Sequence, residues 1–454
     1  MSWRGLSRRV ERIRRKIEKA HLEEINIPYD PVEFAEKILN FHPLPYQERL
    51  LRDPGKRIVV RMSRQAGKTT TIAVKAIWFA ATHPRTLTLI VSPSMRQSMI
   101  MMDRVHGFLM GLPADLRRAL IMKLQRTVVW FRNGSQIVAL PCSIHLLRGY
   151  TAHLVLVDEG AFIRDDETLY YNVLYPMLAT TDGTLIVSST PWGKDSVFYR
   201  MNNDPAFSKH VVTWRDVVEA GLVKQEFIEE MRRVLPAERF MREFEAQFVE
   251  DADSYFPQDL ISRCIDSELE YYRFEDYPIG EFYIGVDFGK KVDYSVVAVV
   301  EKSGDLIKLV HLHRFPLETA YASVIGYIKA LSDRYQHVYG VCVDQTGVGE
   351  YITEDMMRAG IPNVQGVILT LQKKQEILGI LKQKMQNDLI RIPYDAELIA
   401  EINIEKFELT KEGQIKFSHP EGTHDDRLWA FALAVYAASQ SAGQIEVATG
   451  RVWK

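Results

Sequence analysis

The chain has 454 residues, which predicts two to four domains at roughly 100–200 residues each. With 46% hydrophobic and 26% charged residues it is too apolar for a disordered chain, and its net charge of −2 argues against a histone-like binder, though not against an enzyme that gathers basic residues locally. No apolar run approaches the ~20 residues of a membrane span, no signal peptide is visible, and the three cysteines are too scattered for a disulfide framework or a zinc site. A reducing cytoplasm fits this composition best.

Residues 1–40 are predicted to form an N-terminal helical arm. Apolar residues between Val10 and Leu22 recur at near-helical spacing, opposite a face of arginines and lysines. The simpler interpretation is a solvated amphipathic helix, and the alternative is a basic arm that touches DNA or a partner protein.

In residues 41–194 short apolar segments alternate with helical ones, which predicts a mainly parallel sheet covered on both faces. A hairpin that turns at Asn133-Gly134 interrupts this alternation. The more polar residues 195–250 suit a small, mostly helical lid subdomain. The expected strands of the sheet are Ile58–Arg61, Leu87–Val91, Leu154–Val157 and Leu185–Val187.

A second α/β unit is expected in residues 279–454, after a hinge at residues 251–278 that shows no clear periodicity. Three consecutive strands, at Phe282–Val286, Tyr294–Val300 and Leu306–His313, precede a helix and further helix–strand alternation. A three-stranded meander followed by helix-separated strands is the order of a ribonuclease-H-like domain.

A glycine-containing loop between the first strand and the next helix predicts a phosphate site. Backbone N–H groups and a helix N-terminus point at phosphates there, Lys68 would reach the β- and γ-phosphates, and the Thr69 hydroxyl would bind Mg²⁺. The loop departs from the usual GxxxxGK[ST] pattern, because Met62 stands where that pattern has its first glycine. The expected ATP-binding residues of the loop are Ser63, Arg64, Gln65, Ala66, Gly67, Lys68, Thr69 and Thr70.

A later apolar strand ends in Asp158-Glu159, which fits a metal-organising Asp158 and a Glu159 that polarises the attacking water. The alternative is a strand that ends in two solvated acids. Together with the phosphate loop, this pair predicts hydrolysis of ATP rather than binding alone.

Four further elements carry weaker signals. Gln47 could read the adenine edge, or be polar surface; Arg64 could stabilise charge on the γ-phosphate. Arg148 could be an arginine finger supplied to a neighbouring subunit, although a salt bridge is the default for a single arginine. Ser188-Ser189-Thr190 could sense the γ-phosphate, or be a strand-end turn.

Carboxylates also end two strands of the second unit and begin its last helix. Asp287, Asp344 and the pair Asp425/Asp426 can converge, and such a cluster repels itself unless cations neutralise it. Two Mg²⁺ ions roughly 4 Å apart would do so and would support phosphodiester cleavage. The alternatives are an N-cap at Asp425 or Asp426 and turn chemistry at Asp344; Asp293 is an outer-shell partner or, more simply, a turn residue.

From Pro45-Tyr46-Gln47 to the helix after Asp426, these motifs resemble the large terminase subunit of tailed bacteriophages and related viruses, the motor that packages DNA into preformed capsids. The resemblance implies an α/β fold: a P-loop ATPase with a RecA/ASCE-like parallel sheet and a small lid, followed by a ribonuclease-H-like nuclease. In that family Ser-Arg-Gln-x-Gly-Lys-Thr is a common Walker A loop, which accounts for Met62. The family's motifs fall on Gln47, Arg64, Asp158, Glu159, Ser188-Ser189-Thr190, Asp287, Asp344 and Asp426, with Asp425 nearby and Arg148 as the intersubunit arginine of some members.

The resemblance further implies ATP and Mg²⁺ as cofactors, with Mn²⁺ as an alternative at the nuclease site. It implies double-stranded DNA, the portal protein and a small terminase subunit as partners, and a homo-oligomeric ring, taken as a pentamer, on the procapsid. The expected location is the host cytoplasm and transiently the portal, with no membrane contact and no place in the mature virion.

Two rival functions stay open at the level of sequence. One is a helicase-like or repair ATPase fused to a structure-selective nuclease, although no second RecA-like repeat is visible. The other is an assembly component that uses nucleotide only as a docking switch, with structural carboxylates.

Overall fold

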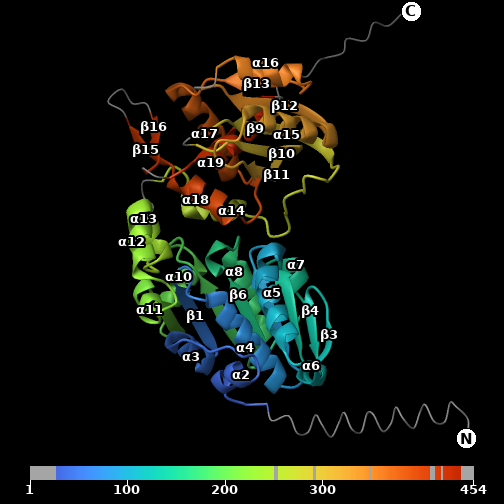
Figure 1. The fold of residues 1–454 in the computed structure, drawn as a ribbon, viewed down its shortest axis with the longest axis vertical. Coiled ribbons are helices and arrows are strands. Elements are labelled where there is room, and N and C mark those ends of the chain that lie inside the picture. The colour runs from blue at the N-terminus through green and yellow to red at the C-terminus, as the bar shows by residue number, and fades with distance from the viewer. Residues whose placement is uncertain are drawn as a thin grey trace, which may run out of the picture.

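The computed structural model describes residues 27–249, 254–289, 293–346, 349–409, 415–420 and 423–440. Most of the expected N-terminal arm lies outside these residues; its described part holds one short helix, α2 (Pro31–Lys37). Figure 1 shows two lobes stacked along the longest axis, with the N-terminal half of the chain in one and the C-terminal half in the other.

The first lobe is built on an eight-stranded sheet of order β3-β4-β5-β2-β6-β7-β1-β8. In sheet order the strands from β5 to β8 run parallel to one another. The hairpin at Asn133-Gly134 joins β5 to the antiparallel β4, which in turn pairs antiparallel with β3. All four strands predicted for this sheet are confirmed. Their bounds are β1 (Arg57–Met62), β2 (Leu87–Ser92), β3 (Ile121–Leu124), β4 (Val128–Phe131), β5 (Gln136–Pro141), β6 (Leu154–Asp158), β7 (Thr184–Ser189) and β8 (Ser208–Val212).

Both faces of this sheet are covered, which explains its long apolar strands. Side chains alternate along β1: Ile58 and Val60 join one core cluster with helices α4 and α5, whereas Val59 joins the cluster on the opposite face. The helices of this lobe up to β7 are α3 (Pro45–Arg52), α4 (Lys68–Thr82), α5 (Met95–Gly111), α6 (Ala114–Leu120), α7 (Ile144–Leu147), α8 (Asp166–Leu169) and α9 (Tyr175–Ala179), with a 3₁₀ turn at Gly160–Phe162 and a π turn at Tyr170–Leu174.

The segment expected to be a mostly helical lid contains a strand that the sequence did not predict. β8 pairs with β1 at the edge of the first sheet, and Ser208 and His210 both hydrogen-bond Asp53 there, His210 Nε2 at 2.7 Å. This five-residue edge strand has three polar residues followed by two valines, so it lacks the polar–apolar alternation that would have predicted a strand. The rest of the segment is helical: α10 (Val197–Asn203), α11 (Trp214–Glu219), α12 (Gln225–Val234) and α13 (Ala237–Glu243).

The second lobe holds a six-stranded sheet of order β13-β12-β9-β10-β11-β14. Strands β9, β10 and β11 form the predicted antiparallel meander, and β12 returns parallel to β9, so the ribonuclease-H-like order is confirmed. The strands are β9 (Ile279–Asp287), β10 (Val296–Ser303), β11 (Leu306–Arg314), β12 (Gln336–Asp344), β13 (Val364–Val367) and β14 (Ile390–Arg391), with a separate hairpin of β15 (Lys406–Leu409) and β16 (Ile415–Ser418). The helices are α14 (Gln258–Cys264), α15 (Tyr321–Arg334), α16 (Tyr351–Arg358), α17 (Leu371–Gln386), α18 (Ala396–Ile404) and α19 (Asp426–Gln440).

Helix α19 lies directly against β9, and a glycine makes this contact. A Cβ atom at Gly285 would stand 2.0 Å from the carbonyl oxygen of Ala430 and 2.3 Å from the amide nitrogen of Ala434. Only glycine leaves room for a helix backbone at that distance. The contact fixes where α19 begins relative to the end of β9, and both places carry carboxylates.

Among the described residues, no helix combines the length and the apolarity that crossing a membrane requires.

Candidate ATPase and nuclease sites

The phosphate loop connects the end of β1 to the start of α4, and left-handed backbone shapes it. Gln65 has φ +63° and Gly67, which caps α4, has φ +75°. The left-handed conformation of Gly67 favours glycine, and a Cβ atom there would also displace the amide of Gln47, whose Nε2 would lie 2.6 Å away. The loop thereby presents the N-terminus of a 15-residue helix, an arrangement suited to anions.

The acids at the end of β6 contact the first residues of α4. Lys68 Nζ lies 3.1 Å from Glu159 Oε1 and 3.5 Å from Asp158 Oδ1, and Thr69 Oγ1 lies 3.4 Å from Asp158 Oδ2. Burial works against the charge of Lys68, but Glu159 and Asp158 outweigh it and raise the pKa of the ammonium group. Glu159 itself has φ +53°, a left-handed conformation that turns its side chain from the strand toward this cluster.

The predicted coupling motif contacts the same two acids. Because β7 lies beside β6 with Ser188 opposite Asp158, Ser188 Oγ donates to Asp158 Oδ1 at 2.8 Å. Ser189 Oγ donates to Glu159 Oε2 at 3.2 Å, and Thr190 lines the adjoining cavity. The hydroxyls are therefore placed where a change at either acid reaches β7 directly.

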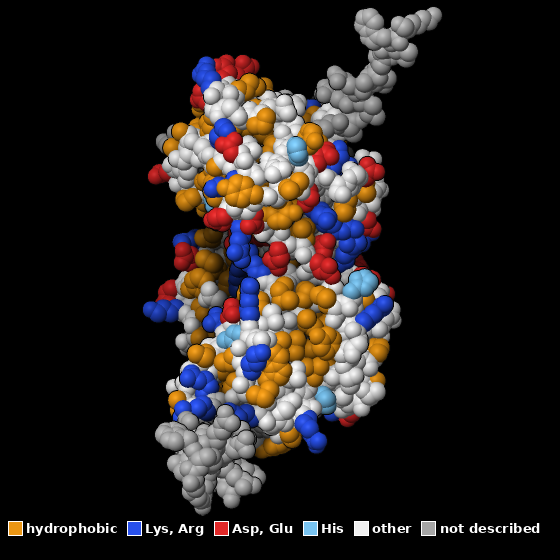
Figure 2. Space-filling model, turned by 90° about the vertical axis from the view of Figure 1, so that its right-hand side faces the viewer, with side chains coloured by type: hydrophobic (Ala, Val, Ile, Leu, Met, Phe, Trp, Pro, Cys, Tyr) orange, Lys and Arg blue, Asp and Glu red, His pale blue; other side chains and the backbone are white. Residues whose placement is uncertain are grey.

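A cavity of about 440 Å³ adjoins the loop, within the range of roughly 300–1,000 Å³ that small-molecule sites occupy. Its wall includes residues from both lobes, which sequence reasoning did not anticipate. Figure 2 shows lysine and arginine side chains gathered at the hollow between the lobes. Besides Ser63 to Thr70, Glu159 and Thr190, the wall includes Arg104 of α5, Trp192, Arg239, Arg242 and Glu243 of α13, and Tyr394, Ala396, Ile399, Ala400 and Asn403 from the second lobe.

Three predicted residues stand apart from the cluster of acids. Gln47 is buried, accepts a bond from Leu44 N at 2.9 Å and donates to Ala66 O at 3.3 Å, so its amide here supports the loop. Arg64 pairs with Glu243 of α13 at 2.8 Å. Arg148, exposed after α7, is not among the residues that line the cavity of its own chain.

In the second lobe the structure brings the predicted carboxylates together. Asp287 and Asp344 end the neighbouring parallel strands β9 and β12, and Asp426 begins α19. Burial and the carboxylates of Asp426, Asp344, Asp425 and Asp293 raise the pKa of Asp287 well above its usual value. Burial is also the main cause that raises the pKa of Asp344, and it raises that of Asp426 to about 6.

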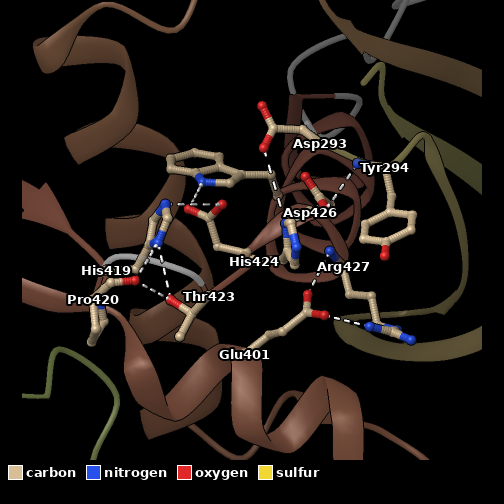
Figure 3. Close-up of polar contacts among 11 residues, drawn as sticks. Asp293, Tyr294, Glu401, His419, Pro420, Thr423, His424, Asp426 and Arg427 are labelled. Atoms are coloured by element: carbon tan, nitrogen blue, oxygen red, sulfur yellow. Dashed lines mark hydrogen bonds and ion pairs between the residues drawn. The ribbon is translucent and has the colours of Figure 1, made fainter. Parts of the chain in front are cut away.

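A histidine that the sequence analysis did not single out lies between two of these acids. His424 Nδ1 is 3.7 Å from Asp426 Oδ2 and 4.0 Å from Asp293 Oδ1 (Figure 3). One potential ligand atom from each of Asp293, His424 and Asp426 falls within 4.8 Å of the others. The sequence did contain a signal for His424, because this residue directly precedes the acidic pair Asp425/Asp426. The position of Asp293, in contrast, depends on the turn before β10.

Asp425 and Asp426 differ in what already holds them. The indole of Trp429 donates to Asp425 Oδ2 at 2.7 Å, and His419 Nε2 lies 3.7 Å from Asp425 Oδ1. Asp426 Oδ2 accepts from the backbone N–H of Tyr294 at 3.2 Å. A set of close carboxylates, most of them partly buried, with one imidazole fits Mg²⁺ or Mn²⁺, because divalent cations would offset the repulsion between the carboxylates.

Comparison with known proteins gives matches to one family model and to relatives along most of the chain. Residues 60–263 match the family described as "Terminase large subunit, T4likevirus-type, N-terminal". The large terminase subunit of Thermus virus P23-45 is 27% identical over 438 residues, which cover 88% of either chain. Over most of its length the chain is similar to large terminase subunits. The expected resemblance is confirmed, and the two sheets give the α/β fold class that it implied.

Two further similarities involve phages of the same host genus. The large terminase subunit of Thermus phage G20c is 26% identical over 437 residues, again 88% of either chain. Among solved structures, the large terminase ATPase domain of Thermus phage P74-26 aligns with a TM-score of 0.41 at 23% identity, covering 48% of this chain and 98% of that one. Proteins of this family work in packaging complexes with DNA.

Proposed function

We propose that this chain is the motor subunit that packages viral DNA: ATP hydrolysis drives double-stranded DNA through the portal into the procapsid, and a two-metal nuclease cuts concatemeric DNA when packaging begins and ends. One observation carries the proposal. A phosphate loop with its acidic partners and a convergent set of carboxylates occupy separate sheets of one polypeptide. The proposed division is an ATPase core at 41–194, a lid at 195–250, a hinge at 251–278 and a nuclease domain at 279–454.

In the ATPase site each group has a distinct role. Lys68 exchanges Glu159 and Asp158 for the β- and γ-phosphates, which frees Glu159 to orient water and accept its proton. Thr69 and Asp158 would hold Mg²⁺, which would supply positive charge beside the phosphates. Arg64 turns from Glu243 to the γ-phosphate, where a guanidinium stabilises the developing charge.

Two auxiliary roles complete the proposal for this site. Ser188, Ser189 and Thr190 sense the state of the acids through the hydroxyl contacts described above. Gln47 reads the adenine edge after its amide leaves Ala66, and the exposed Arg148 acts in the site of the next subunit.

In the nuclease site Asp287, Asp344 and Asp426 would hold divalent cations, which would supply activation of water for attack on a phosphodiester and stabilisation of the leaving oxygen. Asp426 serves as the ligand at the start of α19, because among the neighbouring carboxylates it contributes most to the raised pKa of Asp287. Asp425, His424 and Asp293 border the set and orient it.

The proposal also includes an assembly of several subunits. A neighbour that receives Arg148 requires a ring, and we propose a pentamer on the portal, loaded with DNA by a small terminase subunit. The chain would act in the host cytoplasm and on the procapsid only while DNA enters, and would not remain in the mature virion.

A packaging assay with purified procapsids tests the function. Wild-type chain should show ATPase turnover stimulated by DNA and procapsids, and should protect linear DNA from added nuclease inside the head. A nucleotide-dependent docking switch would bind without turnover, and a repair enzyme would cut branched junctions in preference to linear duplex. Either of these results would contradict the proposal.

A further inference from the structure

Helix α18 lies between the two sites and shows a different face to each. Its residues at helical spacing, Ala396, Ile399, Ala400 and Asn403, line the cavity beside the phosphate loop. Its core face buries Leu398 and Ile402. A third face carries acids, and these point toward the nuclease site.

The acidic face of α18 contacts Arg427, the residue that follows Asp426. Glu401 Oε2 accepts the backbone N–H of Arg427 at 2.7 Å, and Glu401 also pairs with the Arg427 guanidinium (Figure 3). A second acid, Glu397, pairs with the other side of the same guanidinium but is 57% exposed, whereas the side chain of Glu401 is 9% exposed. Glu401 thus anchors the first turn of α19 from both the main chain and the side chain.

The cavity end of α18 is tied to the lid. Arg242 Nη1 of α13 donates to Asn403 Oδ1 at 3.2 Å, and the same guanidinium lies 4.7 Å from the centre of the Trp192 ring, which lines the cavity just after Thr190. Just beyond the helix, Lys406 pairs with Glu238 of α13 at 3.0 Å. Direct contacts therefore run from the lid through α18 to the residue next to Asp426.

We propose that Glu401 is a positioning residue of the nuclease site, and that α18 transmits the occupancy of the nucleotide cavity to it. This inference rests on the proposed function and deepens it, because it states how one site regulates the other. A ligand shifts a conformation only through contacts that differ between two states. Nucleotide in the cavity meets Ile399, Ala400 and Asn403, so it acts on the helix that holds Arg427.

Glu401 acts without touching substrate or metal. Outer-shell partners of a metal site set the orientation of its ligands, and their loss typically costs about 10–100-fold in metal affinity or activity. Arg427 follows Asp426 directly, so a displaced Arg427 main chain displaces the carboxylate that faces Asp287.

The first test replaces Glu401 with glutamine in the full chain and titrates Mg²⁺ in a plasmid-cutting assay. Glu401→Gln should raise the Mg²⁺ concentration for half-maximal cutting, or lower the cutting rate, by about 10–100-fold. Glu397→Gln is the matched control, because it contacts the same guanidinium from solvent, and should change either value less than about threefold. Equal effects of the two variants, or none from Glu401→Gln, would overturn the inference.

A double variant separates positioning from folding. Glu401→Met with Arg427→Met leaves no buried charge unpaired, so folding stability should recover. The Mg²⁺ midpoint should stay displaced, because the N–H of residue 427 still lacks its carboxylate acceptor. Return of a wild-type midpoint would show that the pair serves only to fold the protein.

The second test measures transmission. The rate of plasmid cutting by wild-type chain, at fixed free Mg²⁺, should change when a non-hydrolysable ATP analogue saturates the cavity, and Asn403→Ala should bring the ratio of the two rates close to one. A wild-type ratio of one, or an unchanged ratio in Asn403→Ala, would contradict the role of α18. Absence of cutting by wild-type chain under all conditions would instead refute the proposed nuclease function.

Discussion

The two sites place acidic side chains in opposite electrostatic surroundings. In the first lobe, Asp158 and Glu159 lie within 3.5 Å and 3.1 Å of Lys68 and accept bonds from Ser188 and Ser189, so the protein supplies the compensating charge. In the second lobe, burial and four neighbouring carboxylates together raise the pKa of Asp287. The ATPase site can therefore form without metal, whereas the nuclease site depends on cations or protons to relieve its repulsion.

The largest expected effect concerns the ATPase site, where Lys68 compensates the charge of the acids. Glu159→Gln should lower ATP turnover by about 10²–10⁴-fold, because an amide cannot accept the proton of the attacking water. Nucleotide binding should persist, since Lys68 and the loop are unchanged. Phosphate release and binding of a fluorescent ATP analogue measure the two quantities. Glu167→Gln, which changes an exposed acid of α8, is the control. Full ATP turnover by Glu159→Gln would contradict the assignment of Glu159 as the base.

The second effect concerns the nuclease site, where the carboxylates repel one another. Asp287→Asn should reduce DNA cutting by more than about 100-fold, beyond the usual loss for an outer-shell residue, while ATP turnover stays within about twofold. In chelator the variant should be at least as stable as wild type, because a repelling charge has been removed. Asp305→Asn in the exposed turn between β10 and β11 is the control. Joint loss of cutting and turnover would point to misfolding instead.

Removal of metal sharpens the same comparison. Mg²⁺ at about 100 times its dissociation constant should stabilise the chain by about 2.7 kcal/mol over chelator when no nucleotide is present. The stabilisation should vanish in Asp287→Asn and remain in Glu159→Gln. Thermal melting followed by circular dichroism measures it. An equal rise in all three proteins would show that Mg²⁺ acts elsewhere.

A buried base in the first lobe gives a pH dependence of stability that does not involve metal. Lys75 donates to the carbonyls of Leu50, Leu51 and Asp53, and burial lowers its pKa to about 8. The unfolded chain holds this proton up to its ordinary pKa, so above pH 8 the unfolded state binds more protons and stability rises with pH. The free energy of unfolding of wild type relative to Lys75→Met should therefore grow by up to about 3 kcal/mol as pH rises from about 8 toward 10.5. Urea denaturation at several pH values measures it, and a flat difference would contradict the lowered pKa.

The sequence predicted those parts of the molecule that local pattern determines. The apolar strands β1, β2, β6 and β7 are buried on both faces, so their composition alone marked them. Asp287 and Asp344 could be placed together because parallel neighbouring strands end at the same edge of a sheet.

What the sequence missed depends on contacts between distant segments. Tyr394 and Asn403 line the nucleotide cavity only because the two lobes pack together. No local sequence pattern predicts this packing. The adenine-reading role of Gln47 stays a prediction, since its amide here binds Ala66 of the loop. His424 lay inside a recognised motif, but its contact with Asp293 depends on how the turn before β10 folds against α19.

A crystal structure of the chain soaked in Mg²⁺ or Mn²⁺ tests the contrast between the two sites most directly. The account predicts cations shared by Asp287, Asp344 and Asp426, with oxygen–metal distances of about 2.1 Å for Mg²⁺, and carboxylates drawn toward them. The acids beside Lys68 should stay where they are until nucleotide is added. Carboxylates of the second lobe that bind no cation, or bind cations singly and apart, would contradict the central claim.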